Sequence, residues 1–180
     1  MDRIAQRIRM AMEDVEMIKT IDQDELDALT DAVNNAKRVY VAGWGRAGNC
    51  VKILGMDCSQ MGMEAHICGD NTTPSIHEGD ILVIGSGSGE TKTMVLLAQQ
   101  AKEHGAKLGL ISGNRNSTIG KLADYNVQIT RLPKKEGEPE LSGGSFYHCM
   151  LMTVDLIRTY ICEIRGLTSK DISYNHNNLE

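Results

Sequence analysis

The chain has 180 residues, 41% of them hydrophobic and 24% charged, which is enough to bury the core of one globular domain. Its formal net charge of -5 argues against nucleic acid or an anionic membrane as the main partner. Five cysteines form no Cys-x-x-Cys pair and five histidines show no zinc-ligand spacing, so we expect reduced thiols, a cytoplasmic location and no zinc site.

Two helices are expected over residues 1–36, because Ile4, Ile8 and Met12 recur at helical spacing and Asp22 starts a second such segment. Their outer face is acidic. Apolar strand-like runs then alternate with helical patterns over residues 37–130, which predicts a parallel sheet covered on both faces. The expected strands are 39–42, 65–68, 81–84, 108–111 and 127–129, and the expected helices between them are 47–61, 91–104 and 117–123.

A polar loop over residues 131–142 separates the sheet from a last helix, expected over about 145–165, and a tail runs from 166 to 180. We therefore expect one domain over 1–180, with N-terminal helices (1–36), a sheet core (37–130) and a C-terminal helix and tail (143–180). The two N-terminal helices are too short to hold a DNA-reading module as well as support the sheet.

The turn after the third expected strand is the most informative segment. Ser86, Ser88 and Thr91 alternate with glycines between a strand and a helix. Glycine lets a backbone approach an anion closely, and a helix N-terminus adds unpaired N–H groups and partial positive charge. The turn therefore predicts a phosphate cradle. The alternative is a helix cap made by Ser88, which would account for only one of the hydroxyls.

A second glycine-rich loop, Gly43–Gly48, follows the first expected strand. Its G-x-G-x-x-G spacing is weak evidence for a dinucleotide site, because Glu64 precedes the second strand instead of ending it. Arg46 suits a phosphate better, since a guanidinium offers a fork of donors with a permanent charge.

With these two loops, the chain resembles the SIS (sugar isomerase) domain family, whose members bind phosphosugars. Segments 70–74 and 120–124 fit the same pattern. The tail 176–180 and the chain length resemble the 6-phospho-3-hexuloisomerase branch. The resemblance implies a three-layer α/β/α sandwich around a five-stranded parallel sheet with flavodoxin-like strand order.

The resemblance also implies an activity. That branch interconverts 3-hexulose 6-phosphate and fructose 6-phosphate, moving a carbonyl between adjacent carbons through an enediolate. It implies no metal and no organic cofactor. It further implies a homo-oligomer, often a tetramer, with active sites near subunit interfaces.

Carried over residue by residue, the resemblance assigns His176 in the tail to ring opening or proton transfer; without it, the residue reads as a solvated tail histidine. A histidine suits such a role because it titrates near neutrality. The resemblance assigns substrate-phosphate binding to the residues of the two loops. These are Gly45, Arg46, Ser86, Gly87, Ser88 and Thr91.

Two departures from the family pattern matter. Many relatives carry a serine where this chain has Ala47. The family motif Gly-Thr-x-Phe-Glu at the start of the last helix corresponds here to residues 143–148, with Tyr147 in place of the glutamate and His148 beside it. His148 could act as the base, Tyr147 as an acid, or both could only pack. Glu90 could substitute for the missing carboxylate or complement a helix dipole.

These departures leave three functions open: the hexuloisomerase reaction, isomerisation of another ketose or aldose phosphate, and a non-catalytic phosphosugar-binding regulator.

Overall fold

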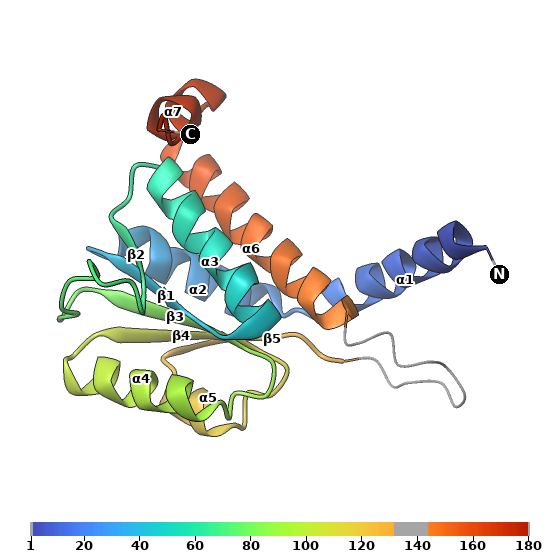
Figure 1. Ribbon diagram of the computed structural model, residues 1–180, viewed down its shortest axis with the longest axis horizontal. Coiled ribbons are helices and arrows are strands. Elements are labelled where there is room, and N and C mark those ends of the chain that lie inside the picture. Colours follow the sequence, from blue (N-terminus) through green and yellow to red (C-terminus); the bar gives the residue numbers. More distant parts are fainter. Residues whose placement is uncertain (1, 132–143, 180) are drawn as a thin grey trace.

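The computed structural model describes residues 2–131 and 144–179 (Figure 1). A five-stranded, fully parallel sheet has the order β2-β1-β3-β4-β5, with helices on both faces. This confirms the expected α/β sandwich and its flavodoxin-like order. The strands are β1 (Val39–Ala42), β2 (Ala65–Ile67), β3 (Ile81–Ser86), β4 (Lys107–Ser112) and β5 (Tyr125–Gln128). The helices are α1 (Arg3–Ile18), α2 (Gln23–Asn35), α3 (Gly45–Gln60), α4 (Lys92–Glu103), α5 (Thr118–Leu122), α6 (Gly144–Arg165) and α7 (Ser169–Asn175).

Alternate residues of the central strands β1, β3 and β4 feed two separate cores. Val39 and Val41 of β1 pack with α2, α3 and α6, whereas Tyr40 and Ala42 pack with α4 and α5 on the opposite face. This follows from the two-residue side-chain period of a strand, and it explains why β1 is apolar at every position and β3 at all but its last residue. The described helices include none long and apolar enough to cross a membrane.

The tail contains a helix that the sequence reading did not assign. α7 begins after Thr168, whose side chain accepts from the backbone of Asp171, while the Asp171 carboxylate accepts from the Thr168 N–H. This reciprocal capping box satisfies backbone groups at the helix start. Asn175 then donates its side-chain amide to the carbonyl of Gln60 (3.2 Å), so α7 is attached to the C-terminal end of α3.

Helix α1 projects from the body of the molecule and packs against α6 (Figure 1). Its expected apolar stripe does not face the core. Ile4, Ile8 and Met12 are 57–73% exposed, whereas Asp14 is 6% exposed. The acidic outer face expected for the N-terminal helices is therefore wrong at Asp14. The stripe identified the helix correctly, but only the C-terminal end of α1, at Met17 and Ile18, packs into the core.

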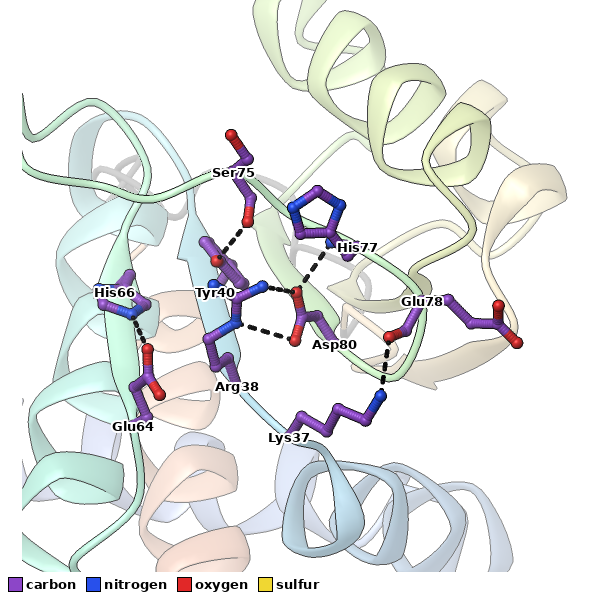
Figure 2. A network of polar contacts seen from close by, with 9 residues as sticks. All are labelled: Lys37, Arg38, Tyr40, Glu64, His66, Ser75, His77, Glu78 and Asp80. Carbon is purple, nitrogen blue, oxygen red and sulfur yellow. Dashed lines mark hydrogen bonds and ion pairs between the residues drawn. The ribbon is translucent and has the colours of Figure 1, made fainter.

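A polar network joins the amino ends of β1 and β3 (Figure 2). Arg38 makes a two-point contact with Asp80, with Nε–Oδ1 at 3.1 Å and Nη2–Oδ2 at 2.7 Å. The backbone N–H of His77 donates to the same carboxylate (2.8 Å), and Asp80 is 1% exposed. Because this buried carboxylate is fully engaged, it fixes the entry of the chain into both central strands.

Replacing Asp80 by alanine is expected to lower the free energy of unfolding by about 2 kcal/mol, because it removes hydrogen bonds to a buried charge. Urea denaturation measures this. Glu78→Gln is the matched control, since only the main-chain carbonyl of Glu78 takes part in the network, and it should change stability by less than about 0.5 kcal/mol. Equal stability of Asp80→Ala and wild type would contradict a structural role for the contact.

Candidate functional site

The two glycine-rich loops lie side by side at the carboxyl ends of β1 and β3. Each permits the other's close approach: a Cβ added to Gly43 would lie 2.8 Å from the carbonyl oxygen of Gly85, and one added to Gly85 would lie 2.9 Å from that of Ala47. Only glycine fits these positions without moving backbone. In a sheet with this order, the edge between β1 and β3 is the switch point at which ligands bind.

The structure brings the predicted hydroxyls together in the second loop. Ser86 Oγ accepts the N–H of Gly89 (3.1 Å) and lies 3.4 Å from Thr91 Oγ1, and Ser88 Oγ accepts the N–H of Glu90 (3.1 Å). A hydroxyl oxygen that accepts a backbone N–H keeps its own hydrogen to donate elsewhere. The loop therefore holds hydroxyl donors that can turn toward an anion.

These hydroxyls do not cap α4. The N-cap residue is Thr91, and no side chain makes a capping bond there. The capping alternative for Ser88 is therefore wrong, and the first-turn N–H groups of α4 add to the loop as an anion-binding feature.

Glu90 anchors the loop and is not poised as a base. Its carboxylate accepts the N–H of Thr118 (2.7 Å) at the start of α5, and this hydrogen bond lowers the pKa of Glu90. The carboxylate is therefore ionised at neutral pH and complements the dipole of α5, not of its own helix. The loop also lies close to the start of α5 at Gly89 (φ +67°), where an added Cβ would overlap Ser117 Oγ.

Trp44 joins the two loops at their exposed side. Its indole Nε1 donates to Thr93 Oγ1 in the first turn of α4 (2.7 Å), although its side chain is 64% exposed. Gly45, at φ +60°, begins α3 directly after it. An exposed indole fixed beside the cradle makes Trp44 a reporter for ligand binding.

The start of α6 holds two guanidinium groups on two aromatic rings. Arg46 lies over the ring of Tyr147 (4.2 Å from the centroid), and Arg131 lies over the ring of Phe146 (4.7 Å). The two rings meet edge to face, 5.4 Å apart. Tyr147, at the position of the family's glutamate, therefore supports Arg46. Arg131 is an additional residue of this group, at the start of the polar loop expected over residues 131–142.

His148 forms a pair with an acid that the sequence reading also missed. Its Nδ1 lies 2.8 Å from Oδ2 of Asp14 in α1, whose other carboxylate oxygen is buried without a hydrogen-bond partner. The imidazole is 46% exposed, while the Asp14 side chain is 8% exposed. Cys149 adds a thiol contact to the Asp14 carbonyl (3.2 Å). A buried carboxylate on Nδ1 fixes the orientation of the ring and leaves Nε2 for proton transfer.

His176 lies away from the cradle in its own chain. It follows α7, which contacts the C-terminal end of α3, whereas the cradle borders the first residues of α3. The 16 residues of α3 span about 24 Å, so the structure does not join His176 to the other site residues of the same chain. No group of three or more His, Cys, Asp or Glu side chains in the described ranges could hold a metal ion.

Comparison with known proteins agrees with this architecture. The SIS domain model matches residues 32–157. The chain is 34% identical over 165 residues to the 3-hexulose-6-phosphate isomerase of Bacillus subtilis, covering 89% of each chain, and 29% identical to that of Mycobacterium gastri, covering 89% of this chain and 82% of the relative. The crystal structure of MJ1247 from Methanococcus jannaschii, from which a 3-hexulose-6-phosphate isomerase function has been inferred, superposes with a TM-score of 0.86 at 26% identity. It covers 97% of this chain and 99% of that one.

Two substitutions of Tyr147 distinguish the contribution of its ring to anion binding from that of its hydroxyl. Tyr147→Phe keeps the support for Arg46 and should leave the affinity for inorganic phosphate within about twofold of wild type, whereas Tyr147→Leu should weaken it about fivefold through loss of the cation–π contact. Isothermal titration measures both. Equal affinities of the Leu and Phe variants would show that the ring does not position Arg46 for anion binding.

Proposed function

The chain belongs to the SIS domain family, in its 6-phospho-3-hexuloisomerase branch, and on that basis we propose that it interconverts 3-hexulose 6-phosphate and fructose 6-phosphate. The observation that carries the proposal is the cradle at the β1/β3 edge, where the hydroxyls of Ser86, Ser88 and Thr91 gather beside the uncapped start of α4. This loop holds the substrate's phosphate, with Gly45, Arg46 and Gly87 beside it.

Binding the phosphate positions the distant carbonyl for chemistry. The reaction removes a proton from the carbon next to the carbonyl, passes through an enediolate, and returns the proton to the neighbouring carbon. One base with a pKa near the working pH performs both transfers. A cation or hydrogen-bond donor stabilises the oxyanion that develops. Arg46 supplies a permanent charge of this kind.

His148 is the proposed base, and Asp14 is its positioning residue. Support comes from the 2.8 Å contact between Nδ1 and the buried carboxylate, which favours the tautomer with its proton on Nδ1 and leaves Nε2 of the half-exposed imidazole as the acceptor. Tyr147 instead supports Arg46, and Glu90 is engaged by α5. The proton-transfer role of the family's glutamate thus moves to the next residue of α6.

Hydrogen exchange tests the proposal. Wild-type protein incubated with fructose 6-phosphate in deuterium oxide should exchange hydrogen at the carbons flanking the carbonyl. His148→Ala should slow this at least about 100-fold, as loss of a general base does. Asp14→Asn should slow it about 10-fold with KM little changed, because the amide no longer fixes the tautomer. His104→Ala, in the exposed C-cap of α4, is the control and should match wild type.

The same experiment separates the other two functions. Exchange with a different phosphosugar, and none with fructose 6-phosphate, would point to an isomerase of another ketose or aldose phosphate. Saturable binding followed by Trp44 fluorescence without exchange, over a panel of phosphosugars, would point to a regulator, the function that the loss of the family's glutamate favours. Failure of every phosphosugar to bind would refute the cradle.

We also propose a homo-oligomer, most simply a tetramer, in which His176 acts at a neighbouring chain's cradle. Two observations support it. His176 lies at the far end of α3 from its own cradle, and the apolar side chains of Ile4, Ile8 and Met12 are exposed on α1, where a second copy can cover them.

Subunit mixing tests this assignment. His148→Ala and His176→Ala are each expected to be nearly inactive alone. Co-refolding equal amounts should restore about a quarter of the sites if His176 acts across a subunit interface, since an intact site then draws one histidine from each variant. A double variant carrying both changes, refolded with itself, is the control. No recovery in the mixture, with oligomers present by analytical ultracentrifugation, would place both histidines in the same chain's site or exclude a role for His176.

A further inference from the structure

Arg131 occupies a fixed position beside the predicted cradle. The backbone leading to it is anchored at two successive residues: the N–H of Ile129 donates to the carbonyl of Ser112 (2.8 Å), and the N–H of Thr130 donates to Thr20 Oγ1 (3.2 Å). The chain therefore leaves β5 at a defined point on the carboxyl edge of the sheet. From there the Arg131 side chain extends over Phe146.

Phe146 is a rigid support for this guanidinium. The ring is 2% exposed and is held between the loops that follow β3 and β4, since a Cβ on Gly87 or on Gly113 would lie 3.3 Å from it. The same Cβ on Gly87 would lie 3.0 Å from Nη2 of Arg131. Gly87 stands between the two serines of the cradle, so the guanidinium lies against the backbone of the cradle itself.

The charge of Arg131 is not neutralised by the described residues around it. Within the described residues, the only side chain that its guanidinium engages is the ring of Phe146, and the Arg46 guanidinium likewise engages only the ring of Tyr147. Arg115, on the same edge of the sheet, differs, because its guanidinium forms an ion pair with Glu25 (2.8 Å). An aromatic face orients a guanidinium without cancelling its charge. No acidic side chain in residues 2–131 and 144–179 therefore takes up the charge or the donors of either aromatic-bound arginine.

We infer that Arg131 is a phosphate-binding residue, closing the Ser86–Thr91 loop from the side of Phe146. This inference rests on the proposed function for the identity of the ligand, a sugar phosphate. The guanidinium offers a fork of N–H donors to phosphate oxygens, and the loop offers hydroxyls and helix N–H groups from the other side. A phosphate dianion is then matched by two permanent cations, Arg46 and Arg131, instead of one.

The test compares three variants in their affinity for fructose 6-phosphate and for inorganic phosphate, followed by Trp44 fluorescence and isothermal titration. Arg131→Gln is expected to weaken both ligands at least about tenfold and by the same factor, as loss of a charge-assisted two-point contact does. Arg131→Lys should recover part of the affinity, because it keeps the charge but not the fork. Arg115→Gln is the matched control and should bind like wild type.

The outcomes distinguish this inference from the proposed function. If wild type binds fructose 6-phosphate and Arg131→Gln binds it within twofold of wild type, the inference is overturned while the proposed function stands. If Arg131→Gln weakens the sugar phosphate but not inorganic phosphate, the residue contacts another part of the sugar and the inference fails. If wild type binds neither ligand, the proposed function fails and the inference fails with it.

Discussion

The close approach of two glycine-rich backbones at the β1/β3 edge is the constraint on which the site depends. Gly43 and Gly85 stand where any side chain would strike main-chain atoms of the facing loop. Because no side chain separates them, the starts of α3 and α4 lie next to each other, and Trp44 can reach Thr93. The cradle hydroxyls, the helix N-termini and Arg46 are brought together by this contact. A larger residue at either position would separate the parts without altering any of the groups that carry chemistry.

A second constraint comes from the start of α6. Phe146 is buried between the loops after β3 and β4, which fixes the first turns of this helix against the cradle. Its neighbours then take different directions: Tyr147 faces Arg46, His148 faces Asp14, and Cys149 reaches the Asp14 carbonyl. One buried ring thus positions an arginine support, a histidine–carboxylate pair and the attachment of α1. The opposite end of the sheet, at the amino ends of β1 and β3, is held by other contacts, among them that of Arg38 with Asp80 (Figure 2).

Local sequence was enough to predict the sheet and the loop of glycines and hydroxyls that follows β3. The strands are short apolar runs with turns on both sides, and β1 was predicted at its observed bounds. β5 was placed two residues late, because Tyr125 and Asn126 join it only by pairing with β4. The α7 helix had a readable signal in the spacing of Thr168 and Asp171, which the capping box explains.

Contacts between residues that are far apart in the chain could not be predicted from local sequence. Asp14 is separated from His148 by 134 residues and lies on a helix whose apolar residues Ile4, Ile8 and Met12 are exposed, so its burial depends on where α6 packs. Arg131 has an ordinary loop sequence around it, and only its position over Phe146 distinguishes it. The face of α1 was misjudged for the same reason: periodicity shows that a helix has an apolar side, not which side the rest of the chain covers.

The replacement of the family's glutamate by Tyr147 affects which residues bind the anion and which transfer the proton. A carboxylate at position 147, beside Arg46, would draw that guanidinium into an ion pair and use part of its charge. A tyrosine holds the same guanidinium by its ring and leaves the charge in place. Proton transfer then needs a base that does not oppose the arginines, and an imidazole whose Nδ1 lies against a buried carboxylate meets this condition. The loss of the glutamate and the presence of the Asp14–His148 pair are, in this proposal, two parts of one arrangement, in which anion binding and proton transfer rest on adjacent residues of α6.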